Sequence, residues 1–181
     1  GNVVVTTHLY DGKKSLPLDI ELYQHGDSLL EGKKDPKFKK KPTVAWELID
    51  KSLTRGSRPK IVLIDSAYGN NTSFLKDLEK KRLNYIGGIA KNRNLLFKTA
   101  SGKLDTIRID EYAQRISSEE FKEIQIDNEK PKTVWVAIIE AEISRLEDQR
   151  RIAIVMNAPV FEEAEDIDYL ITNVEGEIVT E

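Results

Sequence analysis

The clearest hydrophobic pattern in this chain is a short apolar run that ends in a carboxylate. Residues 61–64 are apolar, Asp65 follows, and a Gly/Asn turn and a helical pattern come next. A β-branched run of this length predicts a strand over 60–65 that is buried on both faces of a mixed or parallel sheet. Open α/β sheets bind ligands at the carboxyl ends of their strands, so Asp65 is a candidate functional residue.

Two alternating patterns before this strand predict a β-hairpin. Residues 2–10 and 16–23 are joined around Asp11-Gly12, a dipeptide typical of tight hairpin turns. In the second strand apolar and polar positions alternate, which predicts one buried face and one wet face. The positions predicted to be buried are Leu16, Leu18, Ile20 and Leu22.

Two helical patterns flank the 60–65 strand. The first has Thr43 as its expected N-cap and runs to about residue 55, and the second spans 72–82. A further strand over 84–90 completes a strand–helix–strand unit. Short crossovers of this kind join parallel strands, so strands 60–65 and 84–90 are expected to run parallel in one sheet that also contains the hairpin.

Short strand patterns dominate after residue 93. A short helix is expected near 110–116, and the polar link 145–149 predicts a long antiparallel hairpin on either side of it. The predicted strands are 95–98, 104–109, 121–126, 133–143, 150–157 and 168–174.

Composition excludes several classes of site. The 181 residues are 39% hydrophobic and 33% charged, which is typical of a globular chain that buries a core. No apolar run is long enough for a membrane span, and no signal-peptide pattern opens the chain. The absence of cysteine excludes disulfides, thiolate zinc sites and cysteine nucleophiles, and two histidines offer little for a histidine-based metal site.

The charge is unevenly distributed although the net charge is only -3. Residues 1–100 carry 19 Lys+Arg against 11 Asp+Glu, whereas residues 101–181 carry 9 against 20. A basic first half favours a polyanion as partner. The alternative is that the lysine-rich segment 33–41 is an ordinary solvated loop.

Several motifs stand within this order of hairpin, helix, strand ending in Asp, helix and strand. They are Val3-Val-Val-Thr-Thr-His8-Leu-Tyr, Leu16-Pro-Leu-Asp-Ile-Glu-Leu-Tyr23, Lys41-Pro-Thr-Val-Ala-Trp-Glu-Leu, Asp65-Ser-Ala-Tyr68-Gly69 and the stretch 74–90. Together they resemble the ribonuclease-H-like catalytic core of DDE transposases from bacterial insertion sequences. The resemblance is close over 2–93 and looser over 94–174, where the family often carries a β-rich insertion.

The resemblance implies an α/β fold with a ribonuclease-H-like mixed sheet, helices, and a β-rich insertion in the second half. It divides the chain into a partial core over 1–93, an insertion region over 94–167, and a return strand with the start of the core's C-terminal part over 168–181. The family sheet also places a strand between the hairpin and strand 60–65. That strand is expected to precede residue 1.

The resemblance also implies metal-dependent chemistry on DNA. Family members hold two divalent metal ions, Mg²⁺ or Mn²⁺, with three carboxylates, and they cleave and join phosphodiester bonds. Asp65 matches the second carboxylate and is the expected catalytic residue and metal ligand. The first is expected before residue 1, and the third on a helix beyond residue 181, because Glu175, Glu177 and Glu181 follow the last strand too closely. The chain is therefore expected to be inactive alone.

The implied partner is DNA, as transposon ends and target. Lys91, Arg93 and Lys98 follow a strand at the same sheet edge as Asp65 and are candidates for phosphate contacts, or else form an ordinary basic loop. Self-association, a location in the bacterial cytoplasm and no contact with a membrane are further expectations from the family.

Two other functions fit the same residues. The chain could be a non-catalytic module that binds DNA or protein, in which Asp65 only caps a helix. It could also belong to a different ribonuclease-H-like nuclease, since a fold does not fix an activity. The number of carboxylates at the site distinguishes the first alternative from a transposase core.

Overall fold

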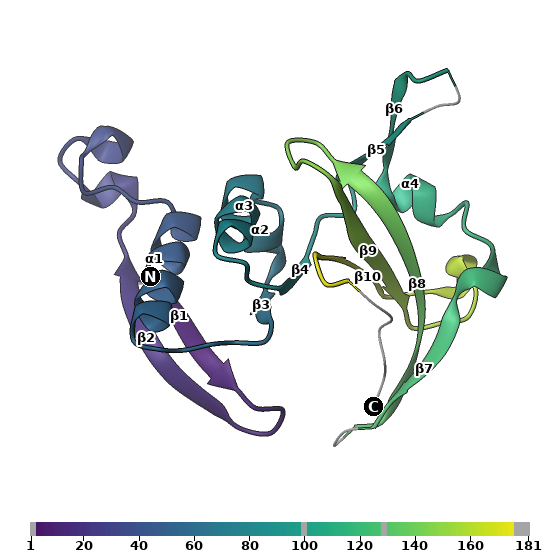
Figure 1. The fold of residues 1–181 in the computed structure, drawn as a ribbon, viewed down its shortest axis with the longest axis horizontal. Helices are drawn as coiled ribbons and strands as arrows, with labels where there is room; N and C mark the ends of the chain where they lie inside the picture. Colours follow the sequence, from purple (N-terminus) through teal and green to yellow (C-terminus); the bar gives the residue numbers. More distant parts are fainter. Residues whose placement is uncertain (1–2, 99–100, 128–129, 176–181) are drawn as a thin grey trace. The chain divides into compact units, whose positions relative to one another are not determined.

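The computed structural model describes residues 3–98, 101–127 and 130–175. The chain divides after Lys60 into two compact units, which are described separately here. The described residues contain four α-helices, a two-stranded sheet and a mixed eight-stranded sheet. Figure 1 labels these helices and strands along the chain. The fold is therefore mixed α/β with additional strands, as the sequence predicts.

The first unit is a hairpin covered by one helix. Two short 3₁₀ helices connect the hairpin to the helix. The bounds are β1 (Val3–Tyr10), β2 (Ser15–Tyr23) and α1 (Lys41–Thr54). The two strands pair antiparallel, and Asp11 holds their turn because its Oδ1 accepts the backbone N–H groups of Lys13 and Lys14.

Helix α1 begins earlier than predicted. Its N-cap is Lys40, whose carbonyl oxygen accepts the N–H groups of Thr43 and Val44, so Thr43 lies inside the first turn. Pro42 explains the early start, because its fixed φ suits the first helical turn and its missing N–H needs no partner there. Gly56 follows the helix end with φ +99°, as its position in the sequence predicts.

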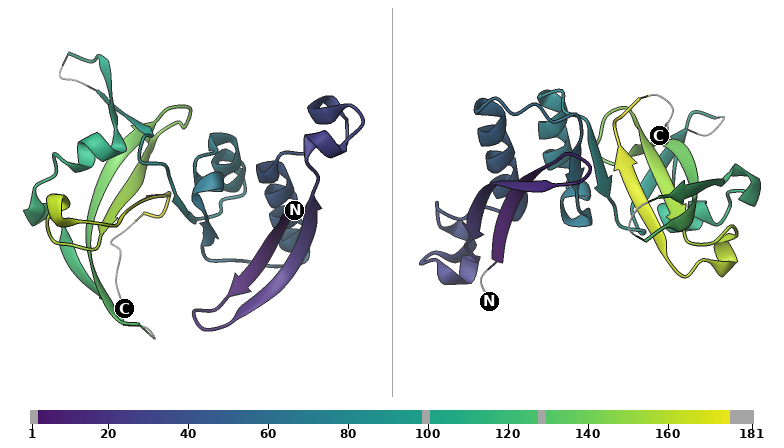
Figure 2. Two further views of the ribbon diagram at one scale, coloured as in Figure 1. Left: turned by 180° about the vertical axis from the view of Figure 1, so that it is seen from behind. Right: turned by 90° about the horizontal axis from the view of Figure 1, so that it is seen from below.

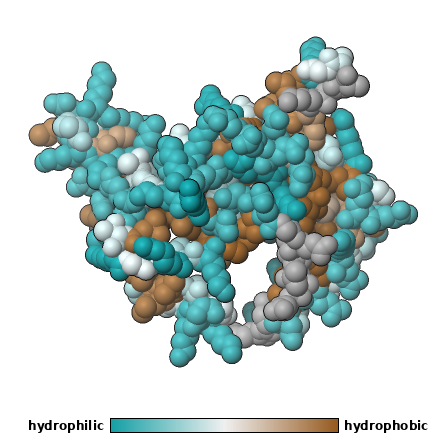
Figure 3. All heavy atoms as spheres, in the orientation of Figure 1, coloured by the Kyte–Doolittle hydropathy of each residue, from teal (hydrophilic) through white to brown (hydrophobic). Residues whose placement is uncertain are grey.

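The prediction for the buried face of β2 was wrong. Leu16, Ile20 and Leu22 are 59%, 68% and 54% exposed, and apolar surface appears in brown over this hairpin in Figure 3. The side chain of Asp19, predicted to be wet, is only 7% exposed. The reason is that α1 covers the Asp19 face and brings two cations to it: Lys51 Nζ and Arg55 Nη1 each lie 2.8 Å from the Asp19 carboxylate.

The second unit is built on an eight-stranded sheet with the order β3-β4-β10-β9-β8-β5-β6, and β7 pairs with β8. Figure 2 shows this sheet from two further sides. The strands are β3 (Val62–Ile64), β4 (Tyr85–Gly88), β5 (Asn94–Lys98), β6 (Leu104–Arg108), β7 (Lys122–Ile126), β8 (Lys132–Ile143), β9 (Gln149–Met156) and β10 (Ile167–Thr172). The helices are α2 (Ser66–Gly69), α3 (Thr72–Lys80) and α4 (Ile109–Ala113).

Two predicted pairings are confirmed. Strand β3 runs parallel to β4, and β8 pairs antiparallel with β9 as a long hairpin. Strand β10 pairs with β4 on one side and β9 on the other, so the β-rich second half joins the core strands in one sheet. Whether residue 93 marks the start of an insertion stays a prediction.

The prediction that the hairpin joins this sheet was wrong. Within the described residues, β1 and β2 pair only with each other, and no strand pairs with the outer side of β3. The strand that the family resemblance places between the hairpin and β3 is not among these residues. As an edge strand, β3 is also not buried on both faces: Leu63 is 66% exposed, while Val62 and Ile64, on the opposite face, are half-buried.

The buried Asp19 carboxylate gives a testable dependence on pH. Hydrogen bonding to Lys51 and the Arg55 charge lower the pKa of Asp19 below 3.8, so its ion pairs stabilise the folded state above that pH and are lost as the pH falls through the lowered pKa. We expect Asp19→Asn to lower the urea midpoint of the first unit at pH 7, with the difference from the parent chain narrowing below pH 3.8.

Fluorescence of Trp46 in α1 would report the urea unfolding of the first unit. A Trp135→Phe background leaves Trp46 as the one tryptophan of the chain. Asp27→Asn, at an exposed position of the same unit, is the control and should leave the midpoint unchanged. Equal midpoints for Asp19→Asn and its parent at pH 7 would contradict this account of the hairpin.

Candidate functional site

Asp65 lies at the carboxyl end of β3 and is exposed. It is the N-cap of α2, and its Oδ1 accepts the N–H of Ala67 at 2.9 Å and of Tyr68 at 3.3 Å. These bonds fix the orientation of the carboxylate, because one of its oxygens is held against the first turn of the helix. The structure therefore confirms that Asp65 caps a helix.

Capping leaves the second carboxylate oxygen open. In the described part of the chain, no hydrogen bond or ion pair engages Asp65 Oδ2. Tyr68 lies beside it and packs on Phe74, with ring centroids 5.4 Å apart. Burial, and to a lesser degree the charge of Asp65, raises the pKa of Tyr68, so its phenol stays protonated at neutral pH. An exposed, charged oxygen on a fixed support is suited to bind a cation.

Helix α2 rests directly on the backbone of β4. A Cβ atom at Gly69 would lie 2.0 Å from the Gly88 carbonyl oxygen, and one at Gly88 would lie 3.2 Å from Ser66 N. No other residue fits at Gly69 without moving backbone atoms. The hydrophobic pattern does not predict this contact, although the Gly87-Gly88 pair within a strand is a usable signal for close backbone approach.

The loop after β4 is bound to the same helix. Asn70 Oδ1 accepts the N–H of Ala90 at 2.9 Å, and Arg93 Nη1 donates to the Asn70 carbonyl oxygen at 3.0 Å. Arg93 is therefore half-buried and placed beside α2. The sequence predicts that Asp65 and Arg93 lie at the same end of the sheet. In the structure Asp65 caps the start of α2, and Arg93 binds the carbonyl oxygen of Asn70 at the end of that helix.

The other two basic candidates are less tied to this site. The side chain of Lys91 is exposed, and its carbonyl oxygen accepts the N–H of Asp110. Lys98 pairs with Leu104 through the backbone, and its side chain lies outside the described residues. Their roles as DNA contacts stay predictions.

The described residues supply one carboxylate for a two-metal site. Among them, no group of three or more His, Asp or Glu side chains is arranged to hold a metal ion. Glu175 lies beyond the end of β10, at the opposite edge of the sheet from Asp65, because β10 runs antiparallel to β4. Glu177 and Glu181 lie outside the described residues. These residues alone do not fit a pair of metal ions.

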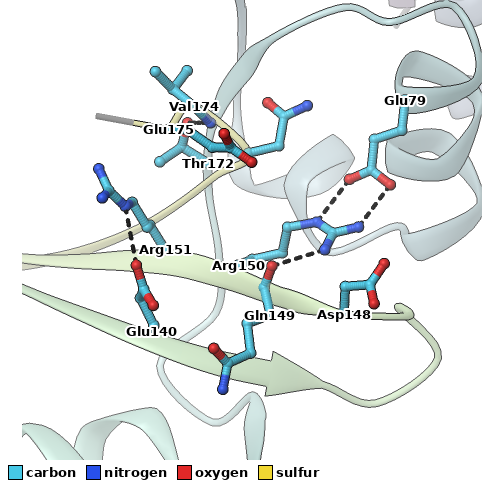
Figure 4. Close-up of a pocket in the computed structure, with 10 residues that line it drawn as sticks. Glu79, Glu140, Asp148, Gln149, Arg150, Arg151, Thr172, Val174 and Glu175 are labelled. Atoms are coloured by element: carbon cyan, nitrogen blue, oxygen red, sulfur yellow. Dashed lines mark hydrogen bonds and ion pairs between the residues drawn. The ribbon is translucent and has the colours of Figure 1, made fainter. Parts of the chain in front are cut away.

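A separate pocket of about 480 Å³ lies at that opposite edge, between α3, the start of β9 and the end of β10. Figure 4 shows Glu79 and Arg150 facing each other within it, joined by two hydrogen bonds of 2.8 Å. The buried Tyr85 donates its OH to Glu79 at 2.8 Å, and its pKa is raised, mainly by burial. This network joins α3, β4 and β9 and has a structural role.

No helix in the described part of the chain is long and apolar enough to cross a membrane.

The family model described as DDE superfamily endonuclease matches residues 1–134, which include both Asp65 and Arg93. The chain belongs to the DDE superfamily of endonucleases. This membership confirms the predicted resemblance, and DDE endonucleases generally use divalent metal ions and act on DNA. Asp65 is thus an exposed acidic residue, at a strand end, in the part of the chain that matches a metal-dependent family.

The chain is also similar to part of a known transposase. The chain is 34% identical over 93 residues to a probable transposase for insertion sequence element IS701 from Microchaete diplosiphon. The match covers 51% of this chain and 24% of the relative. The matched part of this DDE endonuclease chain therefore spans about a quarter of the length of that transposase.

The contact between Gly69 and β4 is testable by stability measurements. Helix propensity alone would make Gly69→Ala stabilising, but the added methyl group meets the Gly88 carbonyl oxygen. We expect a loss of about 2 kcal/mol in the free energy of unfolding of the second unit, a typical cost of overpacking. Urea unfolding followed by Trp135 fluorescence in a Trp46→Phe background measures it.

Ala67→Ser, at an exposed position of the same helix, is the control and should change the free energy of unfolding little. A Gly69→Ala variant as stable as its parent would show that α2 does not rest on β4 as described.

Proposed function

We propose that this chain is part of the catalytic core of a DNA transposase. In this proposal Asp65 is one of three carboxylates that bind two divalent metal ions, Mg²⁺ or Mn²⁺, for phosphodiester cleavage and strand transfer. The observation that carries the proposal is the open Oδ2 of Asp65, at the end of a parallel strand within the matched family region.

The capped geometry supports this role. Mg²⁺ prefers oxygen ligands in a fixed octahedral geometry, so a ligand that is already oriented binds at a smaller entropic cost. The hydrogen bonds from Ala67 and Tyr68 hold Oδ1 and leave Oδ2 without a hydrogen bond among the described residues. Asp65 and the two further carboxylates would hold the metal ions, which would supply activation of the attacking oxygen and stabilisation of the leaving oxygen in phosphoryl transfer.

The proposal requires two carboxylates from outside the described residues. The outer side of β3, which has no partner strand within these residues, offers backbone groups for a strand that would carry the first carboxylate. The third would follow β10. Under this proposal the chain is incomplete and does not cleave DNA alone.

The proposed partners are transposon ends and target DNA. Lys91 is exposed at the Asp65 edge and is proposed to contact a phosphate, and the same role is proposed for Lys98. Self-association of the parent protein and a location in the bacterial cytoplasm stay predictions.

One observation favours a second function, a non-catalytic module that binds DNA. The described residues hold no group of three or more acidic side chains arranged to bind a metal ion, so Asp65 could serve as a helix cap alone. Loss of Asp65 would then leave any cleavage by the parent protein unchanged. The effect of one substitution on cleavage therefore separates the two functions.

In the full-length parent protein, we expect Asp65→Asn to reduce cleavage of labelled transposon-end DNA at least about a hundredfold. The estimate is based on groups that only support metal ligands, whose loss already lowers metal affinity or activity about 10- to 100-fold. DNA affinity in a mobility-shift assay should change less than about twofold, because the amide keeps the capping geometry.

Asp168→Asn is the matched control, since Asp168 is an exposed carboxylate at the start of β10, the end of that strand nearest the Asp65 edge. It should leave cleavage intact. Full cleavage by Asp65→Asn would refute the catalytic role of this residue.

The purified 181-residue chain should not nick DNA with Mg²⁺ or Mn²⁺ present. One carboxylate does not hold two metal ions in the geometry that phosphoryl transfer needs. Supercoiled plasmid is a sensitive substrate for this assay. Metal-dependent nicking that disappears in Asp65→Asn would mean that another carboxylate of this chain completes the site.

A further inference from the structure

Asn70, which directly follows α2, uses its side-chain amide to connect two segments of the site. Its Nδ2 donates to the carbonyl oxygen of Ser66 at 2.6 Å, and its Oδ1 accepts the N–H of Ala90 at 2.9 Å. Ser66 is the first residue of α2, and Ala90 lies just after β4. One half-buried side chain therefore ties the start of the helix to the chain that leaves the sheet.

The two partners of this side chain specify an amide. The Ser66 carbonyl needs a donor and the Ala90 N–H needs an acceptor, and asparagine carries both on one short planar group. The opposite orientation of the amide would set donor against donor and acceptor against acceptor, so the partners also fix which atom is Nδ2. An aspartate would offer only acceptors and would leave the Ser66 carbonyl without its side-chain donor.

The Ser66 carbonyl belongs to a peptide group that orients Asp65. A peptide group is planar, and its C=O and N–H point in opposite directions. The carbonyl oxygen of this group accepts the Asn70 amide, and its N–H, which belongs to Ala67, donates to Asp65 Oδ1 at 2.9 Å. A continuous chain of hydrogen bonds therefore runs from Ala90 through Asn70 and one peptide group to the Asp65 carboxylate, and bonds in such a chain strengthen one another.

Helix α2 needs this support because it is short. It spans only Ser66–Gly69, about one turn, and a helix of one turn is not stable on its own. The backbone N–H of Asn70 also donates to the Ser66 carbonyl oxygen, at 3.1 Å, so that oxygen accepts two donors from one residue. Arg93 in turn donates to the Asn70 carbonyl oxygen at 3.0 Å. Asn70 is thus held by the loop after β4 while it holds the peptide group that faces Asp65.

We propose that Asn70 is a positioning residue for Asp65. It acts through the Ser66–Ala67 peptide group, whose N–H it directs at the carboxylate. This role in DNA cleavage rests on the proposed function, in which Asp65 is a catalytic carboxylate. A group that only orients a metal ligand is still needed for full activity, since its loss typically costs about 10- to 100-fold in metal affinity or activity.

The informative variant is Asn70→Asp, because an aspartate still accepts the Ala90 N–H but no longer donates to the Ser66 carbonyl. The matched control is Asn71→Asp. Asn71 is the adjacent half-buried asparagine, and as the N-cap of α3 its Oδ1 accepts the N–H of Phe74. An aspartate caps a helix as well as an asparagine does. The two variants therefore add the same charge at neighbouring positions, and of the hydrogen bonds described here only the one to the Ser66 carbonyl is lost.

The first measurement is amide hydrogen exchange in the 181-residue chain, followed by NMR. We expect the Ala67 N–H to exchange at least about tenfold faster in Asn70→Asp than in Asn71→Asp, because its peptide group is no longer held. Asn70→Ala, which loses both amide bonds without adding a charge, should show the same increase. An equal increase at Ile154, in the centre of β9, would mean a general loss of stability and would overturn a positioning role.

The second measurement is cleavage of transposon-end DNA by the full-length parent protein. We expect Asn70→Asp to lower the rate at saturating DNA at least about tenfold and to change the KM for DNA less than about twofold, because a misdirected carboxylate affects the chemical step and not DNA binding. Asn71→Asp should stay within about twofold of the wild-type rate, because it keeps the cap of α3.

Faster Ala67 exchange together with a lower cleavage rate, in both Asn70 variants and not in Asn71→Asp, would support the proposal. Unchanged Ala67 exchange in Asn70→Asp would overturn it, and so would an unchanged cleavage rate in that variant if Asp65→Asn abolishes cleavage. If Asp65→Asn leaves cleavage intact, the proposed function fails, and the exchange of the Ala67 N–H alone then decides whether Asn70 positions the carboxylate.

Discussion

The close contact between α2 and β4 is the constraint on which the candidate site depends. Gly69 and Gly88 let a helix turn lie on strand backbone without intervening side chains. That contact fixes the direction of α2, and α2 in turn orients the carboxylate at its N-cap and the Asn70 carbonyl at its other end. The short helix α2 therefore carries Asp65 at its first end and the carbonyl oxygen that binds Arg93 at its other end.

This geometry gives the two carboxylate oxygens of Asp65 different roles. A carboxylate that only caps a helix and one that binds a metal ion are usually treated as alternatives. Here Oδ1 is held by two backbone N–H groups while Oδ2 is open. Capping therefore orients the oxygen that the proposed function requires.

Much of the fold could be predicted from local patterns. The parallel β3–β4 pair and the β8–β9 hairpin follow from short-range periodicity and connection length. Local periodicity does not predict which face of β2 is buried. Alternation of apolar and polar residues identifies two faces without indicating which one a helix will cover. Asp19 is buried since Lys51 and Arg55 of α1 reach it, a contact that depends on tertiary packing. Likewise Leu63 is exposed because β3 is an edge strand within the described residues.

The candidate site was predictable to a similar extent. The position of Asp65 follows from an apolar run that ends in a carboxylate, whereas the bond from Arg93 to the Asn70 carbonyl oxygen depends on how the loop after β4 packs against α2. The most direct test of the central claim is a crystal structure of the full-length parent with Mn²⁺ and transposon-end DNA. The account predicts an anomalous peak within about 2.1 Å of Asp65 Oδ2, the distance of an inner-sphere oxygen ligand. Metal ions bound at the cleavage site without Asp65 would contradict it.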